Sequence, residues 1–325
     1  MTSTLAPGAQ TKAITNPATT SRFHEDIIAG LSANQKTIPS QWLYDEKGSK
    51  LFEEITRLPE YYPTRTETEI LRSHADQLTS RINAEAVLIE YGAGASEKTR
   101  ILLDQLPDLS AYVPIDVSED FLAETAQDLR ESYPGLKVEP VVADFLGDIK
   151  MPPLPENQRV GFFPGSTIGN LSDPEIHAFL IRAHRLIGGS GAFILGVDLR
   201  KPIDILIPAY DDAAGVTAAF NLNLLHRANR ELSADFEPSG FRHRALWNES
   251  ESRIEMHLVS ATDQTVRISD QVFTFEAGET IHTENSRKFS LEDMHRLCGG
   301  TGWRIADIYQ DRHALFAVLI LQPCP

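Results

Sequence analysis

Cysteine and long apolar runs are scarce in this chain of 325 residues, and each scarcity excludes a class of protein. The only two cysteines, Cys298 and Cys324, have no C-x-x-C spacing, which excludes a disulfide framework and argues against a structural zinc site. No apolar run approaches the roughly 18 residues that span a bilayer, and the first 20 residues lack the apolar segment of a secretory signal. We therefore expect a cytoplasmic protein.

Positive charge is also in deficit. Lysine and arginine total 30 against 46 aspartates and glutamates, so the net charge is −16 with the histidines neutral. Such an acidic surface repels phosphate backbones and anionic lipid, which argues against a nucleic-acid or membrane partner. The ten histidines show no ligand spacing such as H-E-x-x-H, so we expect no metal. A small-molecule ligand remains, and we expect the protein to act on it as a monomer.

Strand and helix patterns alternate between residues 86 and 199. AVLIEYGAG is typical of a strand that ends in a glycine turn, and the helical pattern SEKTRILLDQL follows it. Four further strands are predicted at AYVPIDVS, LKVEPVVADF, GFFPGSTIGN and AFILGVDL. This alternation predicts an α/β fold with a parallel sheet and helices on both faces. Ligands of such sheets bind beyond the carboxyl ends of the strands.

The pattern changes after residue 201. A predicted helix over 211–232 is followed by segments with the alternation of antiparallel strands, such as RIEMHLVSA. The first pattern resumes near Ser290, which with Asp293 forms an N-cap pair. We therefore predict a domain that is split by an α+β insertion. The predicted division is a disordered tail at 1–20, one domain formed by 63–200 with 289–325, and a second formed by 21–62 with 201–288.

The first glycine turn favours one cofactor over another. A dinucleotide fingerprint needs a third glycine after Gly92 and Gly94, and this chain has glutamate there, which would repel a pyrophosphate. S-adenosylmethionine carries no phosphate. Asp116 ends the second strand, where it can bind ribose hydroxyls, and Asp144 and Phe145 end the third, where they can bracket adenine. The alternative is that the glycines serve only a tight turn and the aspartates are helix N-caps.

Two other segments allow either of two interpretations. The stretch from Gly165 to Asn170 offers small residues, backbone donors and one amide at the end of the fourth strand, but it also fits a turn and an N-cap. The pair Tyr61 and Tyr62 precedes a proline and, by itself, is more typical of packing than of function.

Six strings together carry a family resemblance: LPEYYPTRTE, SEKTR, GSTIGNL, AYDDAAGVTAAFN, NRELSADF and RIEM. They closely resemble the S-adenosylmethionine-dependent histidine Nα-methyltransferases of ergothioneine biosynthesis, from about Trp42 to Phe289. The resemblance implies a class I (Rossmann-like) methyltransferase domain with an inserted α+β substrate-binding domain, which agrees with the predicted split. It also implies three successive methylations of the α-amino group of L-histidine, giving hercynine.

The resemblance implies a role for individual residues. Tyr44 and Asn170 would be the catalytic residues that orient the amine, Glu284 and Ser286 would hold the imidazole, and Tyr210 the carboxylate. The substrate-binding residues it implies are Tyr44, Tyr61, Gly165, Asn170, Tyr210, Met256, Glu284 and Ser286. The S-adenosylmethionine-binding residues it implies are Gly92, Gly94, Lys98, Asp116, Asp144 and Phe145.

This chain departs from the family strings at Asn285 and Arg287, where a small residue and a cysteine are usual. Alternation along a strand predicts that both side chains point away from Glu284 and Ser286. From the residues alone, Glu284 and Ser286 would read as a solvated polar strand face, and only the resemblance assigns them to a pocket. Two alternatives stay open: an Nα-methyltransferase of another amino acid such as tryptophan, and a non-catalytic methyltransferase-like binding subunit.

Overall fold

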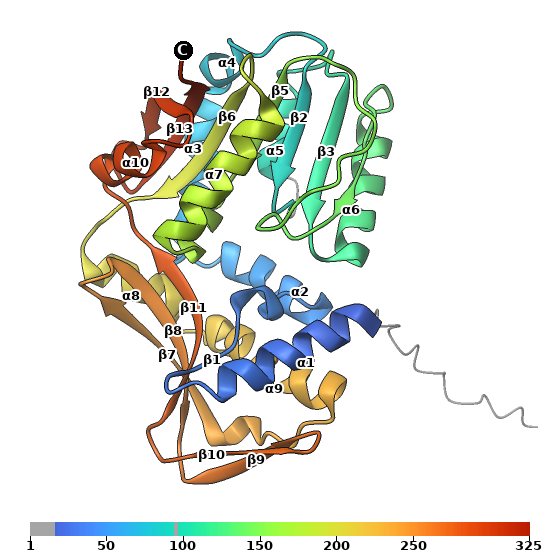
Figure 1. The fold of residues 1–325 in the computed structure, drawn as a ribbon. Coiled ribbons are helices and arrows are strands. Elements are labelled where there is room, and N and C mark those ends of the chain that lie inside the picture. Colours follow the sequence, from blue (N-terminus) through green and yellow to red (C-terminus); the bar gives the residue numbers. More distant parts are fainter. Residues whose placement is uncertain (1–16, 94–96) are drawn as a thin grey trace, which may run out of the picture.

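The structure, a computed structural model, describes residues 17–93 and 97–325 (Figure 1). Gly94 of the predicted cofactor turn lies outside the described residues, as do residues 1–16. Helix α1 begins at Pro17, so the prediction of a disordered tail over 1–20 is wrong for residues 17–20. Across the described ranges, no helix is both long and apolar enough to cross a bilayer.

A seven-stranded sheet forms the upper part of the molecule in Figure 1. Its order is β12-β13-β6-β5-β2-β3-β4, in which β6 to β4 are parallel, and β13 and β12 are antiparallel to their neighbours. The strands are β2 (Val87–Tyr91), β3 (Ala111–Asp116), β4 (Val141–Val142), β5 (Arg159–Phe163), β6 (Ala192–Asp198), β12 (Trp303–Gln310) and β13 (Phe316–Pro323). The predicted α/β fold with a central parallel sheet is confirmed.

Helices cover both faces of this sheet, and its central strands are therefore buried on both sides. One apolar cluster joins the sheet to α7 (Asp173–Ile187) and α10 (Leu291–Cys298). A second cluster joins the other face to the remaining helices, which are α3 (Tyr62–Ser73), α4 (Ala75–Thr79), α5 (Glu97–Leu103) and α6 (Glu119–Ser132). The sheet is therefore doubly wound, and the carboxyl ends of its parallel strands face the lower part of the molecule.

The third predicted strand is shorter than expected. The sequence predicts a strand over 136–145, and the structure has only Val141–Val142 and an isolated bridge at Val138. Pro140 lies between these two pieces and has no N–H to donate to the ladder, which accounts for the interruption.

A smaller, four-stranded sheet lies below the first one. Its order is β1-β11-β8-β7, and a separate hairpin, β9 with β10, extends from it. These strands are β1 (Lys36–Thr37), β7 (Phe241–Asn248), β8 (Arg253–Ser260), β9 (Gln264–Ile268), β10 (Gln271–Phe275) and β11 (Thr280–Arg287). One apolar cluster packs this sheet against α1 (Pro17–Leu31), α2 (Glu46–Thr56), α8 (Ile203–Tyr210), α9 (Val216–Leu232) and the short 3-10 helix η1 (Ser40–Leu43).

Helix α8 was not predicted as a separate element, and α9 begins later than the expected helix over 211–232. Asp212 explains the start of α9, because its carboxylate accepts hydrogen bonds from the backbone N–H groups of Val216 (3.0 Å) and Thr217 (2.7 Å). Gly215 precedes the helix with a φ of +76°, a conformation that favours glycine. These two residues end the turn after α8 and set the direction of α9.

Candidate active site

A cavity of about 760 Å³ lies between the carboxyl ends of the parallel strands and the smaller sheet. Its volume falls within the range of roughly 300–1,000 Å³ that is usual for small-molecule sites. All of the predicted site residues that the structure describes line this cavity: Tyr44, Tyr61, Gly92, Lys98, Asp116, Asp144, Phe145, Gly165, Asn170, Tyr210, Met256, Glu284 and Ser286. The structure therefore brings together residues from the two parts of the molecule.

The glycine turn after β2 is shaped by its backbone. Gly92 has a φ of +70°, and a side chain added there would meet no atom within 4 Å. Glycine is therefore needed for the conformation, and the space beside it is open. At the end of β3, Asp116 accepts a hydrogen bond from the Ser118 backbone N–H (2.9 Å). Burial raises the pKa of Asp116 to about 6, against the opposing effect of the Ser118 and Val117 N–H groups.

Lys98 and Gly165 are both held by a residue that the sequence analysis missed. Glu67 on α3 is completely buried, and its carboxylate accepts from the Lys98 ammonium (2.5 Å) and from the Gly165 backbone N–H (2.8 Å). The backbone N–H of Gly165 is thus already engaged, and its φ of +79° turns the chain toward Asn170. Glu67 fixes the loop after β5 and the start of α5 relative to each other.

Asp144 and Phe145 follow β4 at the edge of the cavity. One carboxylate oxygen of Asp144 accepts from the Leu146 backbone N–H (2.9 Å), and the other accepts from Arg22 of α1 (2.9 Å). The Phe145 ring packs edge-on against Phe163, with 5.2 Å between ring centroids. Arg22 itself lines the cavity, so α1 reaches the predicted cofactor end from the opposite side.

Aromatic rings form a continuous wall on the side of the smaller sheet. Tyr44 lies edge-on to Phe52 and Phe220, and Phe52 lies edge-on to Tyr61, which in turn meets Tyr210 with 6.1 Å between centroids. Burial raises the pKa of both hydroxyls well above the ordinary value. The negative charge of the nearby Glu284 adds to this effect for Tyr44, and the neighbouring Tyr210 adds to it for Tyr61. Both tyrosines therefore stay protonated and can donate hydrogen bonds.

Glu284 and Met256 face each other across β11 and β8. A register shift before Glu284 leaves Thr283 outside the regular pairing, and its hydroxyl donates to the Met256 carbonyl (3.0 Å). Burial raises the pKa of Glu284 to about 7, against the opposing charge of Lys288 and a hydrogen bond from Asn170. The Asn170 amide lies 3.4 Å from the Glu284 carboxylate.

The segment that carries Asn170 lies directly on β11. A Cβ atom added to Gly169 would lie 2.9 Å from the Arg287 carbonyl oxygen, so only glycine allows this approach. Arg287 points outward to an ion pair with Asp173, as the strand alternation predicts. Asn285 lines the cavity, contrary to the same expectation, because β11 borders the cavity along consecutive residues.

A buried polar network behind Ser286 was also missed. The Ser286 and Tyr210 hydroxyl oxygens lie 2.7 Å apart, and the Lys288 ammonium donates to both. Lys288 is paired in turn with Asp198 at the end of β6 (2.7 Å). Asp198 also binds Lys201. The only signal in the sequence was an acid at the end of a strand, as for Asp116.

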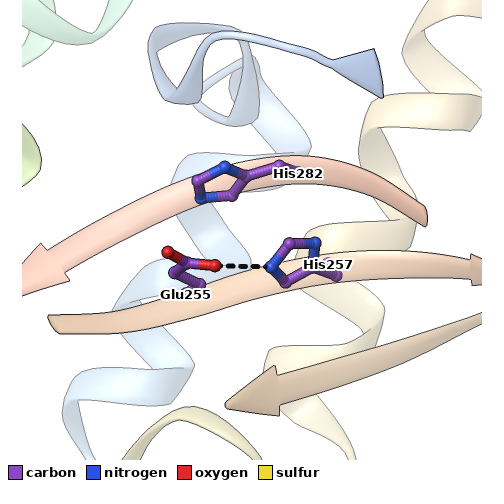
Figure 2. Close-up of side chains that lie close together, drawn as sticks. All are labelled: Glu255, His257 and His282. Carbon is purple, nitrogen blue, oxygen red and sulfur yellow. Dashed lines mark hydrogen bonds and ion pairs between the residues drawn. The ribbon is translucent and has the colours of Figure 1, made fainter. Parts of the chain in front are cut away.

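The structure gathers Glu255, His257 and His282, although their spacing in the sequence predicts no ligand set (Figure 2). His257 Nε2 lies 3.0 Å from the Glu255 carboxylate, and the two imidazole rings are stacked at 17°. Because the two rings are nearly parallel, the nitrogen lone pairs of His257 and His282 lie in separate planes and do not point toward one common position. Glu255 also accepts from Asn248 and Arg253. The Glu255 carboxylate is thus hydrogen-bonded to its protein neighbours. The expectation of no metal stays a prediction.

Comparison with known proteins identifies the family. The model of the histidine-specific, S-adenosylmethionine-dependent methyltransferases matches residues 23–323. The chain belongs to this family. It is 45% identical over 278 residues to the histidine N-alpha-methyltransferase of Mycolicibacterium smegmatis, covering 84% of this chain and 86% of that protein. It is 43% identical to the enzyme of that name from Mycobacterium tuberculosis, covering 82% and 84%.

A more distant relative is named for a biosynthetic pathway. Ergothioneine biosynthesis protein 1 of Schizosaccharomyces pombe is 26% identical over 317 residues, covering 89% of this chain and 40% of that protein. The predicted family and the predicted class I methyltransferase fold are both confirmed. The open space at Gly92 and the half-buried carboxylate of Asp116 fit a cofactor that has ribose hydroxyls and no phosphate.

Proposed function

We propose that this protein transfers methyl groups from S-adenosylmethionine to the α-amino group of L-histidine, three times in succession, giving hercynine in ergothioneine biosynthesis. One observation carries the proposal. The glycine turn and Asp116 open into the same cavity as Glu284 and Ser286, which approach it from the other sheet. A methyl donor at the first group and an imidazole at the second would direct the substrate amine between them.

At the cofactor end of the cavity, the role proposed for each residue follows from where it lines the cavity. Gly92 allows close approach of the backbone, and Asp116 accepts from ribose hydroxyls. Asp144 and Phe145 hold the adenine, and Lys98, fixed by its ion pair, borders the same space. The bound cofactor supplies an electrophilic methyl group.

On the amine side, the substrate nitrogen must be neutral and aligned with the methyl carbon. The Tyr44 hydroxyl and the Asn170 amide orient its lone pair without adding a competing cation. As methyl groups accumulate, the nitrogen becomes a permanent cation and loses its own donors. The faces of Tyr44, Tyr61 and their aromatic neighbours stabilise such a cation by about 0.5–2 kcal/mol.

At the far end, Glu284 accepts from one imidazole N–H while Ser286 contacts the other ring nitrogen. Met256 packs along the side chain, and Tyr210 binds the carboxylate. A substrate without these ring groups would leave Glu284 buried and unpaired, which sites of this kind reject strongly. Gly165 contributes through its turn, because its N–H is bound to Glu67.

We further propose that the enzyme needs no metal and works as a monomer in the cytoplasm. Both cysteines are free thiols, Cys298 buried and Cys324 exposed, which is compatible with a reducing compartment.

The test is a mass spectrum of the products formed from purified protein, S-adenosylmethionine and an equimolar mixture of amino acids, with and without a chelator. We expect histidine carrying one, two and three added methyl groups, no other methylated amino acid, and no effect of the chelator. Methylated tryptophan would overturn the substrate assignment. Cofactor binding without any product would favour the non-catalytic subunit.

A further inference from the structure

Behind Ser286 and Tyr210, which line the cavity, lies a fully buried lysine to which the proposed function gives no role. The side chain of Lys288, which follows β11, has no exposed surface. Its ammonium donates to Tyr210 Oη at 2.7 Å and to Ser286 Oγ at 2.8 Å, and it pairs with Asp198 Oδ2 at 2.7 Å. An ammonium has three N–H donors and no acceptor, so these contacts use all of them and fix its orientation.

Charged groups from several elements surround this ammonium. Asp198 of β6 lies on one side of it. The same carboxylate also binds Lys201, which follows β6, and accepts a hydrogen bond from Tyr62 of α3. Glu284 lies on the side of the cavity. Burial lowers the pKa of Lys288, and the Asp198 carboxylate opposes this.

The ammonium changes what the two hydroxyls can do. Ser286 Oγ and Tyr210 Oη have two protons and four lone pairs between them. One proton lies in the 2.7 Å contact between the oxygens, and either oxygen can be its donor. Lys288 occupies one lone pair on each oxygen and polarises both O–H bonds. The pair therefore favours donating to a substrate over accepting from it.

We propose that Lys288 is a positioning residue that favours donation from Tyr210 to Ser286 and from Ser286 to the substrate, and so restricts the pocket to histidine with a neutral imidazole ring. This inference rests on the proposed function and adds to it the charge state of the bound substrate. Ser286 donates to the unprotonated ring nitrogen, and Glu284 accepts from the ring N–H.

A protonated ring is excluded for two reasons. Its second N–H would meet Ser286, a hydroxyl already accepting from an ammonium. Its positive charge would also lie one hydroxyl away from the Lys288 charge, in a buried site where like charges repel more strongly than in water. The carboxylate of the substrate is attracted by the same positive charge, because Tyr210, which accepts from Lys288, borders the cavity.

The test compares histidine with 1,2,4-triazol-3-ylalanine, whose ring keeps an N–H and lone-pair nitrogens but is not protonated near neutral pH. Dissociation constants of both are measured by calorimetry with S-adenosylhomocysteine bound. Titration of Glu284 and of the substrate amine affects both ligands and cancels in their ratio. With a ring pKa of about 6.5, the ratio of the histidine constant to the triazole constant should rise about tenfold from about pH 7.5 to about pH 5.5.

Two variants assign this dependence to the network. In Lys288→Met the ratio should stay within about twofold across the same pH range, because nothing then rejects the protonated ring. Lys201→Met removes the other ammonium on Asp198, which does not touch the cavity hydroxyls, and should keep the tenfold change. If Lys288→Met does not fold, Ser286→Ala replaces it, since loss of the donor should also flatten the ratio.

A flat ratio in the unmodified protein would overturn the proposal. So would an unchanged tenfold rise in Lys288→Met or, where that variant does not fold, in Ser286→Ala. Loss of the dependence in Lys201→Met would equally contradict it, because the effect would then come from the buried charges in general. Failure of the proposed function looks different: histidine would not bind at any pH.

Discussion

Replacing Glu284 by alanine should weaken histidine binding about 100-fold and change cofactor binding by less than about twofold. A hydrogen bond to a buried charged group contributes about 1.5–3 kcal/mol. In the proposed complex, the hydrogen bond to Glu284 recognises the imidazole ring. The carboxylate is on β11, across the cavity from the glycine turn, so its loss does not alter the cofactor end. Calorimetric titrations with histidine and, separately, with S-adenosylhomocysteine measure the two constants.

Two further variants serve as controls for this result. Asp116→Ala should do the reverse, weakening cofactor binding and leaving histidine binding in place once the cofactor site is saturated. Glu279→Ala lies just before β11 and removes an ion pair with Lys36 outside the cavity, so neither constant should change. Equal losses of both ligands in Glu284→Ala would contradict the role assigned to this residue.

Replacing Asp198 by alanine should lower the free energy of unfolding by about 3–5 kcal/mol, the usual cost of leaving a buried charge without its partner. Both Lys288 and Lys201 bind this carboxylate, and both are buried. Burial alone would raise the pKa of Asp198, and the two ammonium groups more than offset it, so the pKa lies below the ordinary value. This contribution to stability is therefore present above about pH 4 and is lost only as the pH falls through that lowered pKa.

Urea denaturation at neutral pH measures the effect of Asp198→Ala. The matched control is Asp128→Ala, which removes a surface ion pair with Arg100 and should cost less than about 1 kcal/mol. Similar small losses in both variants would show that the network contributes little to stability. Such a result would also remove the structural basis for a fixed Lys288 ammonium.

The doubly wound sheet could be predicted because its signals are local. Each buried strand is a short apolar run with a turn at its end, and Gly92 and Asp116 stand at such ends. The errors have local causes as well. Pro140 interrupts the third strand, and α8 is a short helix with Pro208 inside it, a residue that obscures helical periodicity.

The substrate end of the site could not be predicted from pattern alone. Glu284 and Ser286 alternate along a strand like any polar face, and only the family resemblance indicated their role. Glu67 and Lys288 gave no signal, because charged residues are normally exposed. Their burial depends on partners far along the chain: Lys98 for Glu67, and for Lys288 a carboxylate on the other sheet.

We propose above all that one cavity holds the imidazole at Glu284 and presents only the α-nitrogen to the methyl donor. The most direct test is an NMR spectrum of the product made from S-adenosylmethionine with a carbon-13 methyl group and uniformly nitrogen-15-labelled histidine. We expect every labelled methyl carbon to be coupled to the α-nitrogen. A methyl carbon coupled to a ring nitrogen would contradict it.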